Sequence, residues 1–331
     1  MTRATDGQPF LRSAANPILS AADLPYPANS VFNPGAARLA DETVLLARVE
    51  DMRGISHLHV ARSADGETGW RWDPDVLLRS DVERYPEEIW GCEDPRLTWL
   101  PERDEWAIAY TAYSRRGPLV SLAMTRDFRT VDRLGPAMPP EDKDAALFPR
   151  RIGGRWAMIH RPSPLHGNAN MWISYSPDLR HWGDHTLLLE AREGAWWDAG
   201  KIGLGPPPME TDDGWLLMYH GVRQTSDGPI YRVGLALMDL EDPRIVLHRT
   251  DEWVFGPSEP YELNGDVGRV VFPCGWIVDR ENDVLALYYG AADTTIARAD
   301  ASYSEVMARV RSAPPGWDRR RAGGTGGLIH G

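Results

Sequence analysis

A short apolar pattern occurs five times along the chain, and each copy ends in polar or charged residues. The copies occupy residues 43–51, 106–113, 156–161, 215–220 and 284–293. A short apolar run bounded by turn residues is typical of a buried strand. A repeat of roughly 60 residues indicates a solenoid or a propeller. Five such units nearly fill the 331 residues of the chain.

A second strand pattern follows each copy and ends in a turn of Ser, Thr or Asp. These runs occupy residues 56–66, 120–127, 171–178, 231–239 and 294–300. A β-sandwich with accidental regularity is the alternative, but the two strands recur in the same order in every unit. This order favours an all-β, five-bladed β-propeller with a central substrate cleft. In such a ring the strand ends gather Arg48, Asp51, Arg161, His220 and Asp293 around one axis.

The composition agrees with one turn-rich β domain. Hydrophobic residues make up 42% of the chain, and there are 31 Gly and 27 Pro residues. We predict a propeller over residues 16–311, an N-terminal extension over 1–15 and a flexible C-terminal tail over 312–331. A helix is predicted at 302–310, with Ser304 and Glu305 at its cap.

Charge and cysteine content limit the partners. The net charge of −12 argues against nucleic acid. The sequence has no apolar run of membrane-spanning length and no visible signal peptide, so we expect a cytoplasmic protein without a membrane partner. Cys92 and Cys274 are too few for a disulfide framework and are expected to stay reduced. Among the 14 Trp residues, Trp90, Trp196 and Trp197 lie beside polar motifs and are candidates to line the cleft.

The sharpest local motif is Gly91-Cys92-Glu93-Asp94-Pro95-Arg96, which we place in a loop leading into a strand. On an extended chain Glu93 and Asp94 point to opposite sides. One of them would then face a substrate, and the other could pair with Arg96. For an isolated motif of this kind, a turn with a surface ion pair is the alternative.

Four cationic or potentially cationic residues lie on loops or strand ends of consecutive units: Lys143, Arg161, Lys201 and His220. Arginine suits bidentate contact with phosphate, and lysine supplies a point charge. Each residue alone is better explained by a solvated side chain. Their shared position in the repeat favours an anion site instead. No His, Cys and Asp spacing typical of a metal site is visible.

From about Asn16 to Asp300 the chain resembles glycoside hydrolase family 130, the β-mannoside phosphorylases and related β-mannosidases. The resemblance rests on eight ordered motifs at residues 32–36, 47–51, 93–96, 143–149, 160–162, 200–203, 219–222 and 289–293. It implies a five-bladed propeller, in agreement with the repeat. It also implies inverting phosphorolysis of a β-mannosidic bond, which gives α-mannose 1-phosphate.

The resemblance assigns roles to individual residues. Asp94 matches the general acid, which in the family often acts through a hydroxyl of the bound mannose. The implied phosphate-binding residues are Arg161, Lys201, His220 and, as a fourth basic position, Lys143. The implied substrate-binding residues are Asn33, Arg48, Asp51, Glu93, Asp144, Tyr289 and Asp293. Inorganic phosphate is the expected co-substrate, with no cofactor and no metal. Relatives often assemble, so a homo-oligomer is an expectation.

Three functions stay open at this point. An inverting hydrolase needs an acid and a base, both carboxylates. A phosphorylase needs only the acid, because phosphate is already a charged nucleophile, and it needs cations to hold that nucleophile. The intact cationic set therefore favours a phosphorylase. The alternatives are an inverting β-mannosidase that uses water, with Asp198, Glu210 or Glu262 as base, and a carbohydrate-binding propeller without catalysis.

Overall fold

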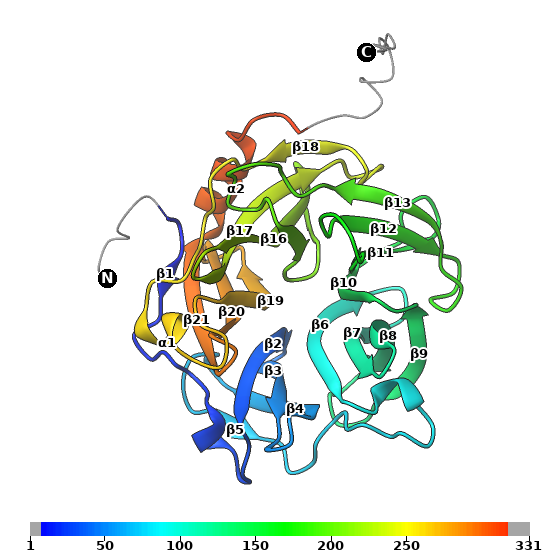
Figure 1. Cartoon of the computed structure of the whole chain (residues 1–331), viewed down its shortest axis with the longest axis vertical. Helices are drawn as coiled ribbons and strands as arrows, with labels where there is room; N and C mark the ends of the chain where they lie inside the picture. The colour runs from blue at the N-terminus through cyan, green and yellow to red at the C-terminus, as the bar shows by residue number, and fades with distance from the viewer. Residues whose placement is uncertain (1–7, 317–331) are drawn as a thin grey trace.

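The computed structural model describes residues 8–316, whose strands form five antiparallel sheets around one axis (Figure 1). Each sheet is one blade, so the predicted five-bladed β-propeller is confirmed. Blade one contains β2 (Ser30–Leu39), β3 (Glu42–Glu50), β4 (Ser56–Ser63) and β5 (Arg71–Trp72). Blade two contains β6 (Cys92–Leu100), β7 (Glu105–Ser114), β8 (Gly117–Thr125) and β9 (Asp132–Met138). Blade three contains β10 (Asp142–Leu147), β11 (Trp156–Pro162), β12 (Met171–Ser176) and β13 (Gly183–Leu189).

The last two blades complete the ring. Blade four contains β14 (Lys201–Leu204), β15 (Met209–Thr211), β16 (Gly214–Thr225), β17 (Gly228–Met238) and β18 (Val246–Arg249). Blade five contains β19 (Val271–Asp279), β20 (Val284–Ala291), β21 (Thr295–Ser302) and β1 (Leu11–Arg12). Short helices lie between the strands: η2 (Ala21–Asp23), η3 (Pro86–Glu88) and α1 (Pro260–Leu263).

The repeat visible in the sequence corresponds to the second and third strands of each blade. The first pattern is β3, β7, β11, β16 and β20, and the second is β4, β8, β12, β17 and β21. The innermost strands, β2, β6, β10, β14 and β19, were not predicted. They carry the Glu93-Asp94 motif, which lies within β6 and not in the loop that we expected. Lys143 is the second residue of β10, so it lies at a strand end, which was one of its two expected places.

The inner strands are irregular in the same way in four blades. Their pairing register shifts between Phe32 and Gly35, Glu93 and Arg96, Lys143 and Ala146, and Pro273 and Gly275. At three of these bulges the polar residues Asn33, Asp94 and Asp144 have φ of 46°, 50° and 54°. Asn and Asp tolerate this left-handed conformation better than most residues. Because a bulge changes the direction of a side chain, the same device redirects one polar side chain in each of blades one, two and three.

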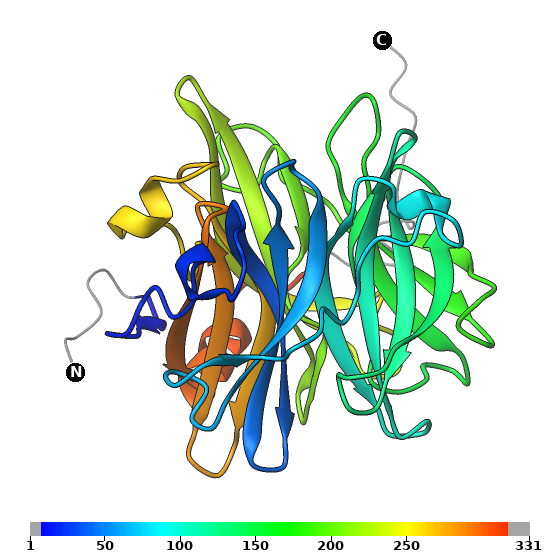
Figure 2. The same ribbon diagram turned by 90° about the horizontal axis from the view of Figure 1, so that it is seen from below.

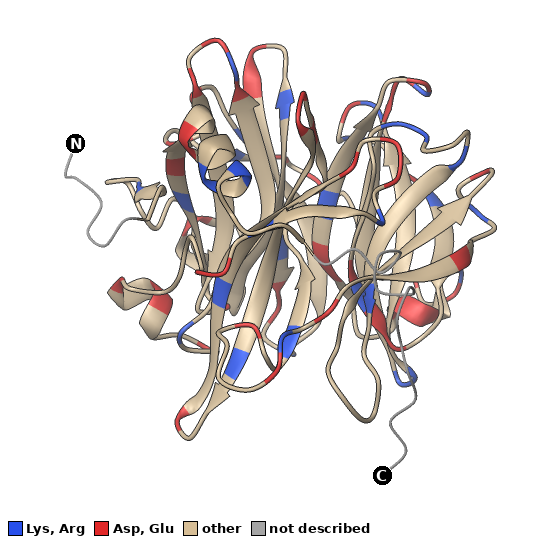
Figure 3. Ribbon diagram, turned by 90° about the horizontal axis from the view of Figure 1, so that it is seen from above, with Lys and Arg blue, Asp and Glu red and all other residues tan. Residues whose placement is uncertain are grey.

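All five inner strands begin on the same face of the ring, which we call the site face. The antiparallel second strands β3, β7, β11, β16 and β20 end there. The site face is uppermost in the side view, where the β16–β17 hairpin extends upward (Figure 2). Basic and acidic residues are interspersed along the described strands (Figure 3).

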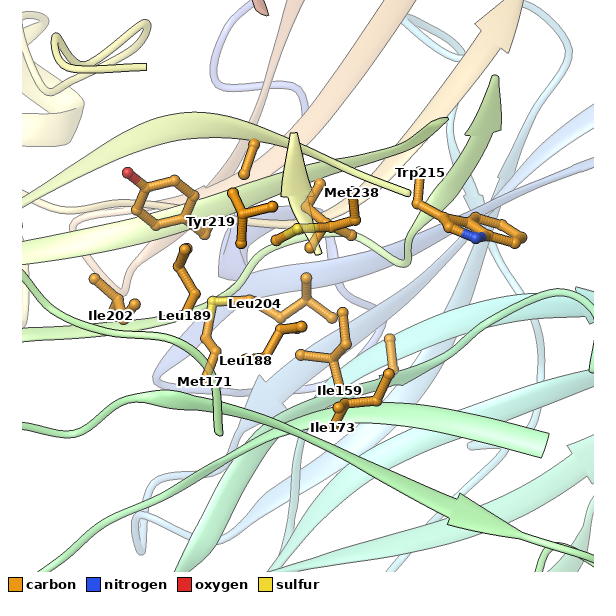
Figure 4. Packing of buried hydrophobic residues seen from close by; sticks show 14 of the residues in the cluster. Ile159, Met171, Ile173, Leu188, Leu189, Ile202, Leu204, Trp215, Tyr219 and Met238 are labelled. Carbon is orange, nitrogen blue, oxygen red and sulfur yellow. The ribbon is translucent and has the colours of Figure 1, made fainter. Parts of the chain in front are cut away.

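Apolar clusters between neighbouring blades hold the ring together. In the largest, Ile159 and Ile173 of blade three pack with Leu204 and Met238 of blade four (Figure 4). Burial of one such side chain contributes about 1.5–3 kcal/mol. Twenty buried residues form this cluster, so the contact between two blades fixes their relative position firmly. The polar groups on the inner strands are held on this framework.

The two ends of the described chain pack against the ring. β1 pairs with β21, so the residues expected as an N-terminal extension include the outer strand of blade five. The predicted helix is confirmed as α2 (Tyr303–Arg311), but its N-cap is Ser302, whose hydroxyl accepts from the Glu305 backbone nitrogen at 3.1 Å. Of the expected tail, residues 313–316 lie along β18, and residues 317–331 are outside the described part, as are 1–7. No helix within residues 8–316 is long and apolar enough to span a membrane.

Candidate active site

Asp94 lies in a buried cluster where blades one and two meet. The side-chain amide of Asn33 donates to Asp94 Oδ1 at 2.8 Å, and Arg48 Nη1 donates to the same oxygen at 3.0 Å. Arg48 Nη2 also donates to Glu93 Oε1 at 3.1 Å. We refer to these four residues as the acid cluster. Glu93 therefore shares Arg48 with Asp94, and the prediction that one of the two acids pairs with Arg96 through its side chain is wrong. The bulge at Asp94 breaks the simple alternation on which that prediction depended.

Arg96 has a different function in the fold. Its guanidinium is fully buried and donates to the backbone oxygens of Gly205 at 2.9 Å and Leu204 at 2.8 Å. Arg96 lies on β6 and its acceptors lie at the end of β14, so this side chain connects blade two to blade four. It also donates to the backbone oxygen of Asp94 at 3.0 Å. The motif thus fixes the backbone that carries Asp94.

The charges around Asp94 keep it ionised in the free protein. Burial alone raises the pKa of Asp94, but Arg48, Lys143, Arg96 and the hydrogen bond from Asn33 outweigh burial and lower it. For Glu93, burial outweighs the attraction of Arg48 and the pKa is raised.

Asp293 lies in the same electrostatic field. Burial and the charge of Asp94 raise the pKa of Asp293 to about 6, against the opposing effects of Arg48 and Lys143. This carboxyl, which follows β20 with φ of 50°, therefore holds its proton more tightly than an ordinary aspartate does. The structure thus places Asp293 close to the acid cluster, as expected.

A second cluster is built around the carboxylate of Asp144. Arg161 Nε donates to Asp144 Oδ2 at 2.7 Å, and His220 Nε2 lies 3.4 Å from the same oxygen. Arg96 Nη2 contacts Asp144 Oδ1 at 3.5 Å. Asp144 is 1% exposed, and although burial opposes it, these neighbours hold the pKa of Asp144 far below its usual range. Asp144, expected to bind substrate, has both carboxylate oxygens occupied by protein groups and holds the basic residues in position.

His220 is neutral in this environment. Burial, together with the charges of Arg161, Arg96 and Lys201, lowers the pKa of His220 to about 3, although Asp144 opposes the change. His220 therefore acts as a hydrogen-bonding group at neutral pH, and the positive charge of this region comes from arginine and lysine. Among residues 8–316, no group hydrogen-bonds to its Nδ1.

Lys201 and Lys143 complete the second cluster, and the structure adds one residue to it. The Nζ of Lys201 lies 5.2 Å from the centre of the Tyr231 ring, and the Tyr231 and His220 rings are 5.9 Å apart. We refer to Lys143, Arg161, Lys201, His220 and Tyr231 as the cation cluster. Lys143 pairs with Arg161 across β10 and β11 and acts on the carboxyls of both clusters.

Tyr231 was not predicted from the sequence. It lies directly opposite Val222 in the β16–β17 pair. An alignment of the two strands of that hairpin around the Tyr219-His220-Gly221-Val222 motif would have placed Tyr231 beside the site.

Two expected substrate-binding residues lie outside both clusters. The carboxylate of Asp51 binds the side chain of Arg53 at 2.7 Å and accepts from the backbone nitrogens of Arg53 and Ile55. Tyr289 is fully buried, and its hydroxyl donates to Glu262 Oε1 at 2.7 Å. Asp51 therefore shapes a loop, and Tyr289 belongs to the core of blade five.

The remaining candidates divide between surface and core. Trp90 and Trp196 are 41% and 43% exposed, whereas Trp197 is buried and stacks on Tyr219. Cys92 and Cys274 are both free thiols in the interior. Within residues 8–316 no three His, Cys, Asp or Glu side chains are arranged to hold a metal ion.

Asp94 and Lys143 lie on inner strands of a five-bladed propeller, and Arg161 and Lys201 belong to the same cation cluster as Lys143. An ionised acid next to such cations suits a carbohydrate-active enzyme that uses phosphate. A family model described as beta-1,4-mannooligosaccharide phosphorylase matches residues 17–312. The chain therefore belongs to glycoside hydrolase family 130, the family of the β-mannoside phosphorylases.

Individual relatives agree with this assignment. The beta-1,4-mannooligosaccharide phosphorylase of Ruminococcus albus is 35% identical over 309 residues, which are 91% of this chain and 90% of the relative. The beta-1,2-mannobiose phosphorylase of Listeria innocua is 39% identical over 260 residues, 77% of this chain and 69% of the relative. The solved complex of the Listeria innocua beta-1,2-mannobiose phosphorylase with beta-1,2-mannobiose matches with a TM-score of 0.82 at 32% identity, over 91% of this chain and 99% of that chain.

Proposed function

We propose that this β-mannoside phosphorylase works by a single displacement with inversion, in which inorganic phosphate attacks the β-mannoside and Asp94 assists the leaving group. The substrate is mannobiose or a manno-oligosaccharide, bound in a central cleft that opens on the site face. The products are α-mannose 1-phosphate and the shortened sugar. The observation that carries the proposal is the cation cluster, which lies next to the acid cluster and is held in place by Asp144.

The positions of the acidic residues argue against water as the nucleophile. An inverting hydrolase needs a second carboxylate as a base. The three carboxylates considered for that role each bind an arginine away from the cation cluster. Asp198 binds Arg192 and Arg249, Glu210 binds Arg150, and Glu262 binds Arg12.

In the displacement, one bond to the anomeric carbon forms while another breaks. A phosphate oxygen forms the bond to the anomeric carbon from the face opposite the departing oxygen, and the glycosidic bond breaks with its electrons on that oxygen. Asp94 supplies the proton that the departing oxygen takes up, directly or through a mannose hydroxyl. Because Lys143 lowers the pKa of Asp94 in the free protein, a phosphate dianion that neutralises Lys143 raises the pKa of Asp94 and favours its protonated form.

The acid cluster and the neighbouring Asp293 bind the mannosyl unit that is transferred. Arg48, Asn33 and Asp293 offer hydrogen-bond donors and acceptors beside Asp94. Arg48 also stacks on the ring of Phe32, with its guanidinium carbon 4.5 Å from the ring centre. These contacts fix Arg48, so that its hydrogen bonds to sugar hydroxyls are preorganised.

Synthesis in the reverse direction tests the proposal and identifies the linkage. The protein is incubated with α-mannose 1-phosphate and a panel of acceptors that includes mannose, glucose and N-acetylglucosamine. We expect a β-mannoside product and release of inorganic phosphate, and the linkage of the product gives the substrate. Failure of every acceptor, combined with hydrolysis of mannosides in phosphate-free buffer, would refute the proposal.

A further inference from the structure

The β16–β17 hairpin has two faces, and only one belongs to the cation cluster. His220 and Tyr231 lie on that face. Side chains alternate along a strand, so Arg232, which pairs with Gly221, points to the opposite side. On that opposite side lies an open cavity of about 480 Å³. Its lining includes Trp196, Trp197, Arg223, Arg232 and Trp253.

Two arginines in this cavity have unused hydrogen-bond donors. Neither Arg223 nor Arg232 has a carboxylate within ion-pair distance in the described part of the chain. The guanidinium of Arg232 lies over the ring of Trp253 at 5.0 Å. Burial and the like charge of Arg223 lower the pKa of Arg232. In a protein of net charge −12, two neighbouring arginines without acidic partners are available to a ligand.

Trp196 is held in position and stays partly exposed to solvent. One face lies on the guanidinium of Arg192, 4.5 Å from the ring centre, and the side chain is 43% exposed. The next residue, Trp197, anchors the loop, because its indole nitrogen donates to the Asp251 backbone oxygen at 2.8 Å. A Cβ added at Gly234 would lie 2.7 Å from the Trp197 ring, so glycine at this position makes room for the anchor.

We propose that this cavity is a secondary binding site for pyranose units of a manno-oligosaccharide, separate from the active site. The face of the Trp196 ring opposite Arg192 stacks on the C–H face of a sugar ring, as aromatic rings in ligand sites do. Arg223 and Arg232 donate to sugar hydroxyls. Glu193 and Glu252 also line the cavity and accept from hydroxyls. This mixture of donors and acceptors fits a neutral polyol better than an anion.

The secondary site affects only oligosaccharides that are long enough to reach it from the active site. The choice of a mannoside as ligand rests on the proposed function, because the sugar is then the enzyme's own substrate. Residues 190–200, which carry Trp196, lead directly into Lys201 at the start of β14. A chain held on the outer side of the hairpin stays close to the active site and has a raised effective concentration there. A disaccharide gains nothing from the second site.

Binding measured without turnover tests the site. Calorimetry of β-1,4- and β-1,2-linked mannohexaose is carried out on the Asp94→Asn protein and on the same protein with Trp196→Ala or Arg223→Ala. We expect each added change to weaken binding of at least one hexasaccharide by about five- to tenfold. Arg129→Ala is the matched control, since Arg129 is an exposed arginine in the loop between β8 and β9. It should leave the affinity unchanged.

Kinetics separate this site from the active site. With Asp94 intact, Trp196→Ala should leave kcat/KM for the disaccharide within about twofold of the unsubstituted protein while lowering it for the hexasaccharide. The inference is overturned if the hexasaccharide does not bind or if the added changes leave its affinity unchanged. It is also overturned if Trp196→Ala lowers kcat/KM for the disaccharide as much as for the hexasaccharide. A change of molar mass on Trp196→Ala in light scattering also overturns it, because the cavity is then an interface between copies. Failure of the proposed function is a different result: no phosphate-dependent cleavage by the unsubstituted protein.

Discussion

Gly290 on β20 leaves the space in which Asn33 holds the acid. A Cβ added at Gly290 would overlap Asn33 Oδ1 and lie 2.8 Å from the Asn33 backbone nitrogen. Gly290→Ala therefore displaces the side chain that donates to Asp94 at 2.8 Å. A hydrogen bond to a charged group contributes about 1.5–3 kcal/mol, so we expect kcat to fall by about 10- to 150-fold. Overpacking should also lower the free energy of unfolding by about 1–3 kcal/mol.

The assay is the initial rate of α-mannose 1-phosphate release at saturating phosphate, with thermal denaturation measured in parallel. Gly183→Ala is the control, because a Cβ at Gly183 meets no atom within 4 Å. A double-mutant cycle with Asn33→Ala isolates the mechanism. If Gly290→Ala acts through Asn33, its effect on kcat shrinks when Asn33 is already alanine. An equal effect in both backgrounds, or activity equal to that of Gly183→Ala, would refute the reasoning.

Other changes test the two clusters separately. Asp94→Asn keeps the shape but removes the proton, so kcat should fall by about 10² to 10⁴ with the fold intact, and Glu93→Gln should do less; near-normal turnover of Asp94→Asn in steady-state assays would contradict its role as the acid. Lys201→Ala should raise KM for phosphate by about 10- to 150-fold and KM for the mannoside far less, whereas equal effects on both would mean a structural role. The pKa of Asp293 is raised from 3.8 to about 6, so the folded protein binds this proton more tightly than the unfolded chain, and stability falls as pH rises between those values. Asp293→Asn should flatten that part of the curve of Tm against pH, and an unchanged slope would mean that Asp293 titrates normally.

The sequence predicted the strands that are apolar and regular, and missed the inner strands, which carry part of the chemistry, including Asp94 and Lys143. β3 and β7 were predicted clearly because each contains an uninterrupted run of buried residues, 43–47 in β3 and 107–112 in β7. β6 and β10 each contain a bulge with a polar residue at positive φ, and β6 also contains Pro95. In a sequence, Pro and Asp are signals of a loop. They persist in strands here because packing between blades holds the backbone in place.

The sequence predicted which residues belong to the site better than it predicted the contacts between them. Positions on the repeat correctly brought Arg161, Lys201 and His220 together. No local rule shows that the carboxylate of Asp144 serves the cations, because its partners come from three other strands. The same limit explains His220, whose neutral state depends on burial and on arginines distant in sequence.

The identity of the first product tests the central claim most directly. Proton NMR can follow a mannobiose incubated with the protein, with inorganic phosphate and without it. With phosphate, the account predicts α-mannose 1-phosphate as the first product and little free mannose derived from the transferred unit. Without phosphate, it predicts no cleavage. Free mannose formed at the same rate in both samples, or β-mannose 1-phosphate as the product, would contradict inverting phosphorolysis at the Asp94 site.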